Sequence, residues 1–414
     1  MSCLHLTVHR ATNQIGGNCV EISAASGERI IVDVGRPLDA PEAATGLLPK
    51  SLDLDRPVSG VLISHPHQDH YGLLAETPAH WPIYSGKAAG RLMHLTASIF
   101  GTAPVRDYHH WEGGKPIEIG PFRVTPYLTD HSAFDAYMLL IEAAGRRIFY
   151  SGDFRAHGRK AVLVRRLMES PPLGIDVLVM EGTNLGSDKP TKSEADLEAD
   201  FVEVFRKTPG RVFVCWSAQN VDRTVTLYRA CLKAGRTLAV DLYTAEVLEL
   251  LADMGHLPRA GWNNLKVIIT WAFARLYESK GRGDFVKRMA AHGVSAARLA
   301  ENTAKWVIMI RPSLIRDLVS KGVTPTLDDV WSYSQWRGYL EKPDGIDLKS
   351  WFDKGGAKAI HLHTSGHASV ADLKAFAAAV KPKMLVPIHG IAWDTDGDGF
   401  GNIVRLRDGE PLVI

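Results

Sequence analysis

The sequence predicts an α/β protein that is divided into two domains. The chain has 414 residues, which is more than one compact core usually accommodates, so two domains are expected. Short β-type segments dominate up to about residue 180, whereas strand-like and helix-like segments alternate from about Asp188 onward. Such alternation is typical of a parallel α/β unit. The composition, with 45% hydrophobic and 23% charged residues, is that of an ordinary globular protein.

Apolar, β-branched segments bounded by Gly, Asp and Pro predict strands in the first part of the chain. They are LHLTVHR (4–10), CVEISA (19–24), RIIVDVG (29–35), VSGVLISH (58–65), FRVTPYL (122–128), AYMLLIEAA (136–144), RRIFYSGD (146–153) and GIDVLVMEG (174–182). One short helix is expected in this part, around KAVLVRRLME (160–169).

The later part of the chain predicts alternating helices and strands. TKSEADLEADFVEVFRKT (191–208) has helical spacing and an acidic first turn, which indicates a helix. A buried strand (211–217), a helix (220–235) and another strand (236–242) are expected to follow. Near the end, the sequence predicts a strand, loop and helix start (358–369), a strand in KMLVPIHG (383–390) and an edge hairpin (402–414). We find no internal repeat.

Three histidines and an aspartate lie within six positions of the segment SHPHQDHYG (64–72), directly after the apolar run GVLI. His65 and His67 alternate along an extended segment, so their side chains can point the same way. Asp69 and His70 follow on the loop and approach the same space from another direction. Imidazole and carboxylate groups are ligands that zinc takes in catalytic sites. This crowding favours a site for two adjacent metal ions over a polar loop that only ends a strand.

A two-metal site needs ligands from other segments, and three candidates follow predicted strands. They are His131, Asp153 and His389. Each alone has a simpler explanation, as a turn former, a loop neighbour or a core histidine. Together they share a setting, the point where a strand gives way to a loop, and sheet-built sites gather their side chains there.

The order of these residues resembles that of the metallo-β-lactamase fold: an HxHxDH motif, then His131, then SGD, then a histidine in PIHG. MEGT (180–183), HTSGHAS (363–369) and PIHG also resemble motifs A, B and C of the β-CASP nucleases, a group that includes ribonuclease J. IGGNCVEI (15–22) and IIVDVG (30–35) are similar to ribonuclease J openings. The resemblance extends over essentially the whole chain.

This resemblance implies a metallo-β-lactamase αββα sandwich with an inserted β-CASP α/β domain. Residues 1–183 and 363–414 would form the metallo-β-lactamase domain, and residues 184–362 the insert. The chain would be a short form that lacks the C-terminal domain of ribonuclease J. Assembly through that domain is then not expected, and the existence of a homo-oligomer stays open.

The resemblance also assigns ligands and catalytic roles. One zinc ion would be held by His65, His67 and His131, the other by Asp69, His70 and His389, with Asp153 bridging the two. Mn²⁺ and Mg²⁺ are alternative metals. A hydroxide between the ions would attack phosphorus, because two metals lower the pKa of water and neutralise the phosphate. Asp69, one of the ligands, is also counted among the catalytic residues.

His367 matches the general acid that would protonate the leaving 3′-oxygen, and Glu181 would orient or polarise it. The simpler explanations are a capping carboxylate for Glu181 and a loop hydrogen bond for His367. A separate metal site at His361, His363 and His367 is a further alternative, but no fourth ligand lies nearby in the sequence.

A second resemblance concerns binding of a substrate phosphate. CWSAQNVDRTV (215–225) resembles the β-CASP segment that meets the 5′-phosphate of a nucleic acid. The matching positions, together with those of HTSGH, are Ser217, Asn220, Arg223, His363 and Ser365. Asp222 stands where a histidine is common, and its negative charge opposes phosphate binding. Ser217 or Asn220 would alternatively cap the helix that follows.

Net charge and cysteine content give weaker indications of the binding partner and the cellular compartment. The formal net charge of +2 neither requires nor excludes a nucleic-acid partner, so phosphate binding depends on local charge. The basic run ESKGRGDFVKR (278–288) is one candidate path for a single strand, although such runs are more often solvated helix faces. Four scattered cysteines, no signal-peptide pattern and no apolar stretch of membrane-spanning length predict a reduced, cytoplasmic protein.

These observations predict a zinc-dependent hydrolase that cleaves phosphodiester bonds of single-stranded RNA, as an exonuclease, an endonuclease or both. A DNA nuclease of the same superfamily is the first alternative, but that branch usually has Val at motif C, where this chain has His389. A non-catalytic nucleic-acid-binding subunit is the second alternative. No membrane partner is expected.

Overall fold

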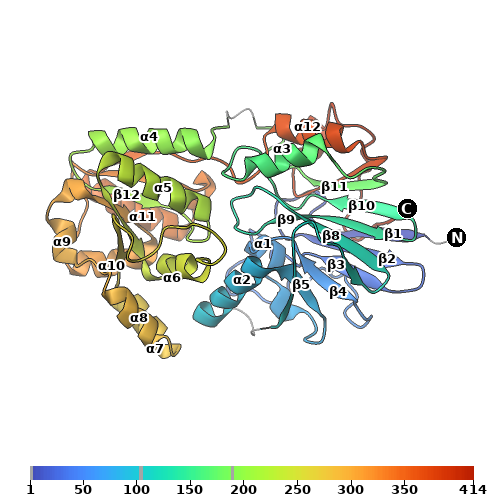
Figure 1. The fold of residues 1–414 in the computed structure, drawn as a ribbon, viewed down its shortest axis with the longest axis horizontal. Helices are drawn as coiled ribbons and strands as arrows, with labels where there is room; N and C mark the ends of the chain where they lie inside the picture. The colour runs from blue at the N-terminus through green and yellow to red at the C-terminus, as the bar shows by residue number, and fades with distance from the viewer. Residues whose placement is uncertain (1–2, 102–105, 188–190) are drawn as a thin grey trace. The chain divides into compact units, whose positions relative to one another are not determined.

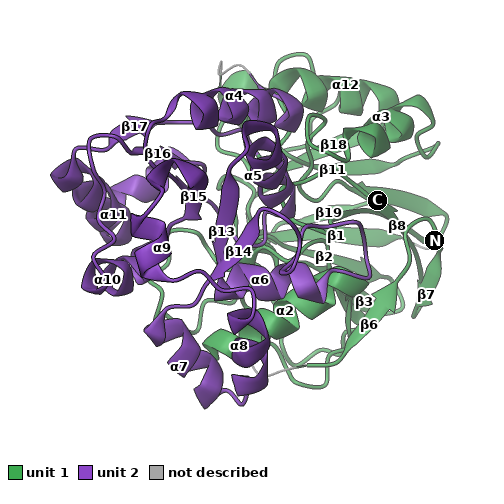
Figure 2. Cartoon of the chain, turned by 60° about the vertical axis from the view of Figure 1, so that its left-hand side comes forward, with its two compact units in different colours: residues 1–190, 366–414 green, residues 191–365 purple. Residues whose placement is uncertain are grey.

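The computed structural model describes residues 3–101, 106–187 and 191–414 of the chain (Figure 1). The chain divides into two compact units (Figure 2). Unit 1 comprises residues 1–190 and 366–414, and unit 2 comprises residues 191–365. Among the described residues, no helix is both long and apolar enough to cross a membrane.

Unit 1 contains two sheets. The first, in the order β19-β1-β2-β3-β4-β5-β6, has seven strands, which are β1 (Leu4–Arg10), β2 (Cys19–Ala24), β3 (Arg29–Val32), β4 (Gly60–Ile63), β5 (Ile83–Gly86), β6 (Tyr108–Trp111) and β19 (Pro411–Val413). The second, in the order β18-β11-β10-β9-β8-β7, has six strands, which are β7 (Ile117–Ile119), β8 (Phe122–Leu128), β9 (Tyr137–Ala143), β10 (Arg146–Tyr150), β11 (Val177–Glu181) and β18 (Met384–Ile388). The helical elements of unit 1 are α1 (Gln68–Tyr71), η1 (Leu74–Glu76), α2 (Lys87–Phe100), α3 (Ala161–Glu169), α12 (Val370–Val380) and α13 (Trp393–Asp396).

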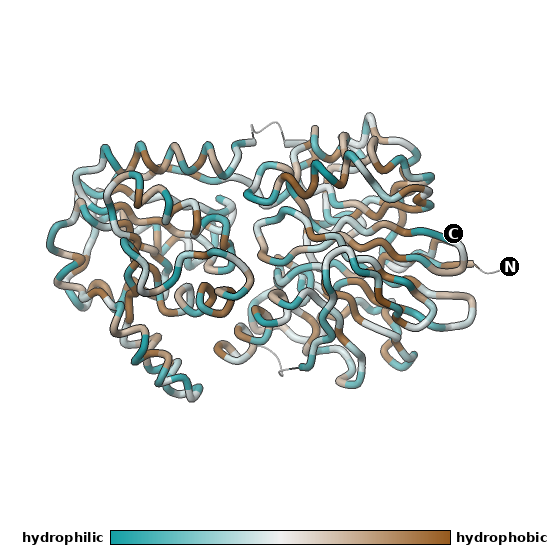
Figure 3. Tube along the Cα trace, viewed as in Figure 1, coloured by the Kyte–Doolittle hydropathy of each residue, from teal (hydrophilic) through white to brown (hydrophobic). Residues whose placement is uncertain are grey.

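The two sheets of unit 1 pack face to face. One buried cluster joins Leu6 and Val20 of the first sheet to Leu139 and Val179 of the second. Alternate residues of the second sheet, such as Met138, point the other way and pack with residues of α3 and α12. The outer face of the first sheet packs similarly with α1 and α2. Helices therefore cover both outer faces, and the predicted αββα sandwich is confirmed (Figures 1 and 3).

Unit 2 is built on a six-stranded parallel sheet in the order β14-β13-β15-β12-β16-β17. Its strands are β12 (Val212–Cys215), β13 (Thr237–Asp241), β14 (Leu265–Ile268), β15 (Trp306–Met309), β16 (Val330–Tyr333) and β17 (Lys358–Ile360). Its helical elements are α4 (Glu194–Lys207), α5 (Val221–Ala234), α6 (Leu242–Leu250), α7 (Trp271–Ser279), α8 (Gly283–Ala290), α9 (Ala296–Ala300), η2 (Thr303–Lys305), α10 (Pro312–Ser320), η3 (Arg337–Glu341) and α11 (Pro343–Gly355).

Local signals in the sequence account for most of these elements. The helix predicted in 191–208 is α4, and it begins with a capping box in which Ser193 and Asp196 satisfy each other's backbone amides. The prediction of an edge hairpin in 402–414 is wrong. Ile403 instead bridges to Leu385, and β19 pairs with β1. The two halves of this segment therefore extend different sheets rather than each other.

A buried ion pair fixes the start of two neighbouring strands in unit 2. Asp329, directly before β16, accepts hydrogen bonds from the backbone amide (2.6 Å) and the guanidinium Nη2 (2.7 Å) of Arg211, directly before β12. The side chain of Arg211 is 4% exposed and that of Asp329 is fully buried. Breaking a buried pair leaves an uncompensated charge, which costs far more than losing a surface pair.

We therefore expect Asp329→Ala to lower the free energy of unfolding by about 3–5 kcal/mol. Chemical denaturation followed by circular dichroism measures this change. The control is Glu203→Ala, which removes the exposed pair with Lys207 and should leave the unfolding midpoint unchanged. Equal midpoints for the two variants would contradict this role of Asp329.

Candidate metal centre

Sheet topology brings the polar side chains of unit 1 to one edge. Strands β8 and β10 both run antiparallel to β9, while β11 and β18 run parallel to β10 or to each other. The C-terminal ends of these four strands therefore lie on the same edge of the sheet. His131, Asp153 and His389 follow three of these ends, and Glu181 is the last residue of the fourth.

The HxHxDH segment joins the same region from the other sheet. His65 follows the end of β4, and α1 carries Asp69 and His70. The backbone amide of Tyr137 at the start of β9 donates to the carbonyl of Ser64 (3.0 Å), which ties the end of β4 to the second sheet. The backbone carbonyl of Asp69 accepts from two consecutive amides in the β1–β2 loop (both 3.1 Å). The loop that carries the histidines is therefore held by the backbone on both sides.

The structure brings all seven expected ligands together. Potential ligand atoms lie within 4.8 Å of one another in each of three groups. The groups are His65, His67 and His131; Asp69, His70, Asp153 and His389; and His131, Asp153 and His367. The first two groups divide the residues as two neighbouring metal ions would, with the Asp153 carboxylate in the second. Because His367 belongs to the third group, its position alone would also allow it to bind a metal ion.

Unsatisfied buried atoms indicate that these residues fit a metal. His65 Nε2, His389 Nε2 and Asp153 Oδ1 are buried, and none has a hydrogen-bond partner among the residues that the structure describes. Buried polar atoms are rarely left unpaired, because each costs desolvation free energy. Imidazole and carboxylate donors are the set that suits zinc and related divalent ions.

Polar residues behind the ligands fix ring orientations. His70 Nδ1 donates to Asp33 Oδ2 (2.7 Å), which also accepts from the hydroxyl of Tyr150 (2.7 Å). His389 Nδ1 donates to the side-chain oxygen of Asn18 (2.8 Å). Each contact leaves the other ring nitrogen to face the centre, as metal-binding histidines require. Asp33 and His389 both adopt left-handed backbone conformations, with φ of 59° and 49°.

Burial and charge determine the protonation of the rings. Burial lowers the pKa of His65 and His131 well below the usual value, and neighbouring histidines lower it further. These rings are therefore neutral, which is the form that binds metal. His70 differs: burial lowers its pKa, but Asp153 and Asp33 outweigh burial and raise it well above the usual value. The carboxylates thus attract positive charge to the place where a divalent cation would lie.

His367 and Glu181 form a second pair beside the ligands. His367 Nδ1 lies 2.9 Å from Glu181 Oε2 and 3.7 Å from Asp153 Oδ2. Glu181 is 1% exposed and also accepts from the backbone amide of Phe154 (2.9 Å). Burial alone would lower the pKa of His367, but the charges of Glu181 and Asp153 raise it to about 9. His367 is therefore protonated near neutral pH and its ring is oriented by a fixed carboxylate.

Sequence reasoning missed four residues of this centre: Asp33, Asn18, Tyr150 and Asn184. The amide of Asn184 donates to the backbone carbonyls of His367 (3.1 Å) and Ala368 (2.9 Å), so it holds the loop that carries His367. Asn18 and Asp33 lie in the quoted segments IGGNCVEI and IIVDVG. Each is a polar residue beside apolar strand residues, which is a signal of a functional position. The sequence does not show, however, which histidine each of them would contact.

The residues expected to bind a substrate phosphate lie in unit 2. Asn220 is the N-cap of α5, and its side chain accepts from the amide of Arg223 (3.0 Å). Ser217 lies just after β12 and is exposed. His363 and Ser365 lie beyond the end of β17. Burial and the charge of Arg223 lower the pKa of His363 to about 3, so its ring is neutral.

Arg223 has a supporting position rather than an exposed one. It is fully buried and forms an ion pair with Glu194 (3.1 Å). Its guanidinium also donates to the carbonyls of Ser334 (3.0 Å) and Thr364 (3.4 Å). Arg223 therefore joins the start of α5 to the 362–365 segment. This geometry does not present its guanidinium to a substrate, in contrast to the expectation of direct phosphate contact.

Two family descriptions match the chain. Residues 12–196 match the metallo-beta-lactamase superfamily, and residues 357–392 match the Zn-dependent metallo-hydrolase RNA specificity domain. The first range contains six of the seven expected ligands together with Glu181, and the second contains His363, Ser365, His367 and His389.

Curated relatives at low identity include ribonuclease J proteins. That of Helicobacter pylori (strain ATCC 700392 / 26695) is 24% identical over 397 residues, which cover 91% of this chain and 54% of the relative. That of Mycobacterium tuberculosis (strain H37Rv) is 24% identical, and the match covers 94% of this chain and 69% of the relative. The chain thus spans about half the length of the first of these relatives.

A solved structure shares the whole fold. A protein of unknown function from Enterococcus faecalis V583 superposes with a TM-score of 0.81 at 20% sequence identity, over 100% of both chains. At this identity the likeness establishes the fold and leaves the activity to be argued from the site.

Proposed function

We propose that this chain, which matches the metallo-β-lactamase superfamily over residues 12–196 and is similar to ribonuclease J proteins, is a zinc-dependent phosphodiesterase that cleaves single-stranded RNA. The observation that carries this proposal is the set of seven buried or half-buried ligands with the His367–Glu181 pair beside them. A metal-binding protein without phosphodiesterase activity would need the ligands but has no use for a protonated histidine held against a buried carboxylate.

The proposal assigns two ions. His65, His67 and His131 would hold one, Asp69, His70 and His389 would hold the other, and Asp153 would bridge them. Such ions lower the pKa of water and offset the negative charge of a phosphodiester under attack. Zinc is the metal of this proposal because imidazoles predominate among the ligands, although Mn²⁺ and Mg²⁺ are compatible with the carboxylates.

The remaining steps belong to residues of the chain. His367 carries a proton at neutral pH and would donate it to the leaving 3′-oxygen, since an alkoxide leaves poorly without protonation. Glu181 keeps the His367 ring oriented through the 2.9 Å contact and stabilises its positive charge. Asp69 would act as both ligand and catalytic residue, and its side chain is 14% exposed.

Recognition of RNA is supported by the match to an RNA specificity domain over 357–392 and by the ribonuclease J relatives. Ser217, Asn220, His363 and Ser365 would contact a substrate phosphate beyond the scissile bond, with Arg223 fixing their segments. Exonuclease and endonuclease modes both remain within the proposal. DNA of equal sequence is the comparison substrate that tests the alternative of a DNA nuclease.

A cytoplasmic location is also part of the proposal. All four cysteines (Cys3, Cys19, Cys215 and Cys231) are free thiols in the structure. Free buried thiols are typical of reducing compartments. We further propose that the insert expected at residues 184–362 is a β-CASP domain that corresponds to unit 2 (191–365), and that the metallo-β-lactamase domain expected at residues 1–183 and 363–414 corresponds to unit 1.

We expect the purified protein to contain about two metal ions per chain and Asp69→Ala to contain about one. Asp69 is the most exposed of the second group, and its backbone contacts do not involve its side chain, so this variant should fold. Elemental analysis of protein purified without chelators gives the count. The control is Asp39→Ala, an exposed position. One ion in both the unmodified protein and Asp69→Ala would refute the two-ion assignment.

We expect His367→Ala to reduce RNA cleavage by about a hundredfold to ten-thousandfold, the usual contribution of a general acid. Its metal content should be unchanged. The control is His94→Ala, on the exposed face of α2. Because Glu181 acts through His367, the double variant Glu181→Gln/His367→Ala should cleave RNA at nearly the same rate as His367→Ala alone. Loss of metal in His367→Ala would make His367 a ligand and refute its assigned role.

We expect only a weak preference for 5′-monophosphate over 5′-hydroxyl RNA, because Asp222 places a carboxylate in the first turn of α5. Asp222→His should strengthen the preference, since it removes the charge and adds an imidazole. Asp222→Asn separates these two effects, because it removes the charge alone. The measurement is the ratio of cleavage rates on the two RNAs. A strong preference in the unmodified protein that neither variant alters would contradict this role of Asp222.

A further inference from the structure

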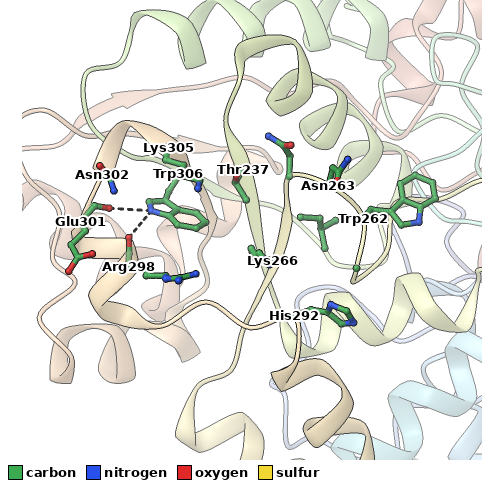
Figure 4. A pocket seen from close by; sticks show the side chains of 13 residues that line it. Thr237, Trp262, Asn263, Lys266, His292, Arg298, Glu301, Asn302, Lys305 and Trp306 are labelled. Atoms are coloured by element: carbon green, nitrogen blue, oxygen red, sulfur yellow. Dashed lines mark hydrogen bonds between the residues drawn. The ribbon is translucent and has the colours of Figure 1, made fainter.

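A polar pocket of about 610 Å³ lies at the N-terminal ends of three neighbouring strands of unit 2 (Figure 4). Its lining includes the first residues of β13, β14 and β15, which are Thr237, Leu265 and Trp306. Ser217 and Asn220 instead follow the C-terminal end of β12. Because all strands of this sheet run parallel, the pocket lies at the opposite edge of the sheet from those residues. It is therefore a separate feature.

Positive charge predominates in the lining of this pocket. Lys266, Arg298 and Lys305 contribute three cations, against the single carboxylate of Glu301. Arg298 and Lys305 are exposed, and Lys266 is half-buried. Within the described ranges of the chain, none of the three cations forms an ion pair with a carboxylate. A concave surface with unpaired cations attracts anions.

The basic run 278–288 provides a contrast. Arg282 pairs with Glu246, Arg288 with Glu249 (2.8 Å) and Lys287 with Asp284 (3.3 Å). Three of the four cations of the run, all but Lys280, therefore already have carboxylate partners, so the run is a weaker candidate for a polyanion than its sequence suggests.

The cationic side of the pocket has a fixed backbone. The indole Nε1 of Trp306 donates to the carbonyl of Arg298 (2.8 Å) and to that of Glu301 (3.3 Å) (Figure 4). Trp306 itself is only 4% exposed, so its buried ring holds the backbone of residues 298–301 in place. The side chains of Arg298 and Lys305 therefore extend from a held backbone, which lowers the entropy lost when they bind a ligand.

The other side of the pocket carries rings and amides. Figure 4 shows Trp262 and His292 on this side, with Lys266 between them and the Arg298–Lys305 side. Both rings are half-buried, but that of Trp262 already contacts the rings of His256 and Tyr228 and the guanidinium of Arg259. His292 is therefore the ring that a ligand in the pocket would meet. Gly261 has a φ of 94°, and a Cβ there would lie 3.3 Å from His292 Cε1, so glycine permits the close approach of this ring. Asn263 and Asn264 complete the wall and offer amide groups.

We propose that this pocket binds a nucleotide unit of single-stranded RNA. The phosphates that flank this nucleotide would lie against Lys266, Arg298 and Lys305, and the base against His292. Single-strand binding surfaces combine cations that follow the backbone with rings that contact bases. The inference rests on the proposed function, and it adds a contact remote from the sheet edge that carries Ser217. A free mononucleotide offers the same chemistry, but three separate cations exceed what one phosphate needs.

The test compares two triple variants of the full chain. One is Lys266→Ala with Arg298→Ala and Lys305→Ala; the matched control is Lys321→Ala with Lys349→Ala and Lys354→Ala, all exposed positions of unit 2. Binding of a fluorescein-labelled phosphorothioate RNA without secondary structure is measured by anisotropy at several salt concentrations. Thermal unfolding verifies that both variants fold.

We expect the pocket variant to bind this RNA tenfold to a hundredfold more weakly at about 0.1 M salt, and the control to bind nearly as the unmodified protein does. Each lost phosphate contact lowers the slope of log K against log salt by about 0.7 for a single strand, so three contacts lower it by about two. Equal affinities and equal slopes for the two variants would overturn the proposal.

Two further ligands identify the chemistry. An abasic strand of the same length and charge should bind more weakly than RNA to the unmodified protein and equally to the pocket variant. Equal binding of RNA and the abasic strand to the unmodified protein would overturn the assignment to a nucleotide. Adenosine 5′-monophosphate should compete only at far higher concentration than RNA. Competition at the same concentration would overturn the assignment to a strand.

Hydrolysis of bis(4-nitrophenyl) phosphate separates this inference from the proposed function, because so small a diester requires only the metal centre. The pocket variant should hydrolyse it at the unmodified rate. Intact RNA binding by the pocket variant, with normal hydrolysis, overturns the pocket assignment alone. Absence of diester and RNA hydrolysis in the unmodified protein refutes the proposed function, while the binding comparison still decides whether the pocket holds RNA.

Discussion

Two buried carboxylates, Asp33 and Asp153, face opposite nitrogens of the His70 ring, and the rest of the centre depends on this arrangement. Asp33 Oδ2 lies 2.7 Å from Nδ1, and Asp153 Oδ2 lies 3.1 Å from Nε2. Asp33 is fully buried and Asp153 is 2% exposed. Burying negative charge is costly unless positive charge accompanies it. The fold satisfies Asp33 with the hydroxyls of Ser64 and Tyr150 and the ring of His70, whereas Asp153 Oδ1 has no hydrogen-bond partner among the described residues and lies 3.7 Å from His389 Nδ1. This oxygen marks where a cation belongs.

The same constraint explains why so many strands end at this centre. A site that holds several charged or polar groups in a buried position needs each group fixed, because a mobile carboxylate would turn toward water. Strand ends provide such fixation, since the backbone is held by the sheet up to the residue before the functional one. His389 follows Ile388 of β18 directly, and Glu181 is itself the last residue of β11. The strained backbone at His389 and Asp33 is stabilised by this packing.

Local patterns in the sequence allowed the strands and the candidate ligands at their ends to be predicted. The αββα sandwich and the division of the ligands between two ions followed from the resemblance to the metallo-β-lactamase fold. Apolar runs mark strands, and a polar residue after each run marks a strand end. Contacts such as Asn18 with His389 could not be predicted in this way, since 371 positions separate the partners. Arg223 shows the opposite limit. Its motif indicated a contact with phosphate. In the structure, however, the guanidinium pairs with Glu194 and donates hydrogen bonds to the carbonyls of Ser334 and Thr364. Such partners become visible only in the three-dimensional structure.

Ion pairing within the protein, more than the number of charged residues, decides which cations can bind a polyanion. The formal net charge of +2 gives no hint of a polyanion, and three of the four cations of the most basic-looking run, 278–288, are paired with carboxylates of α6 and α8. Arg211 and Arg223, each buried against a carboxylate, serve the packing of unit 2. Among the described residues, Lys266, Arg298 and Lys305 have no carboxylate partner, and they line one pocket together. A cation that already has a carboxylate must give it up to bind phosphate, whereas a cation without one gives up water and, at Lys305, a weaker contact with the Trp306 ring. Unpaired charge is therefore a better guide to a polyanion than the density of Lys and Arg along the sequence.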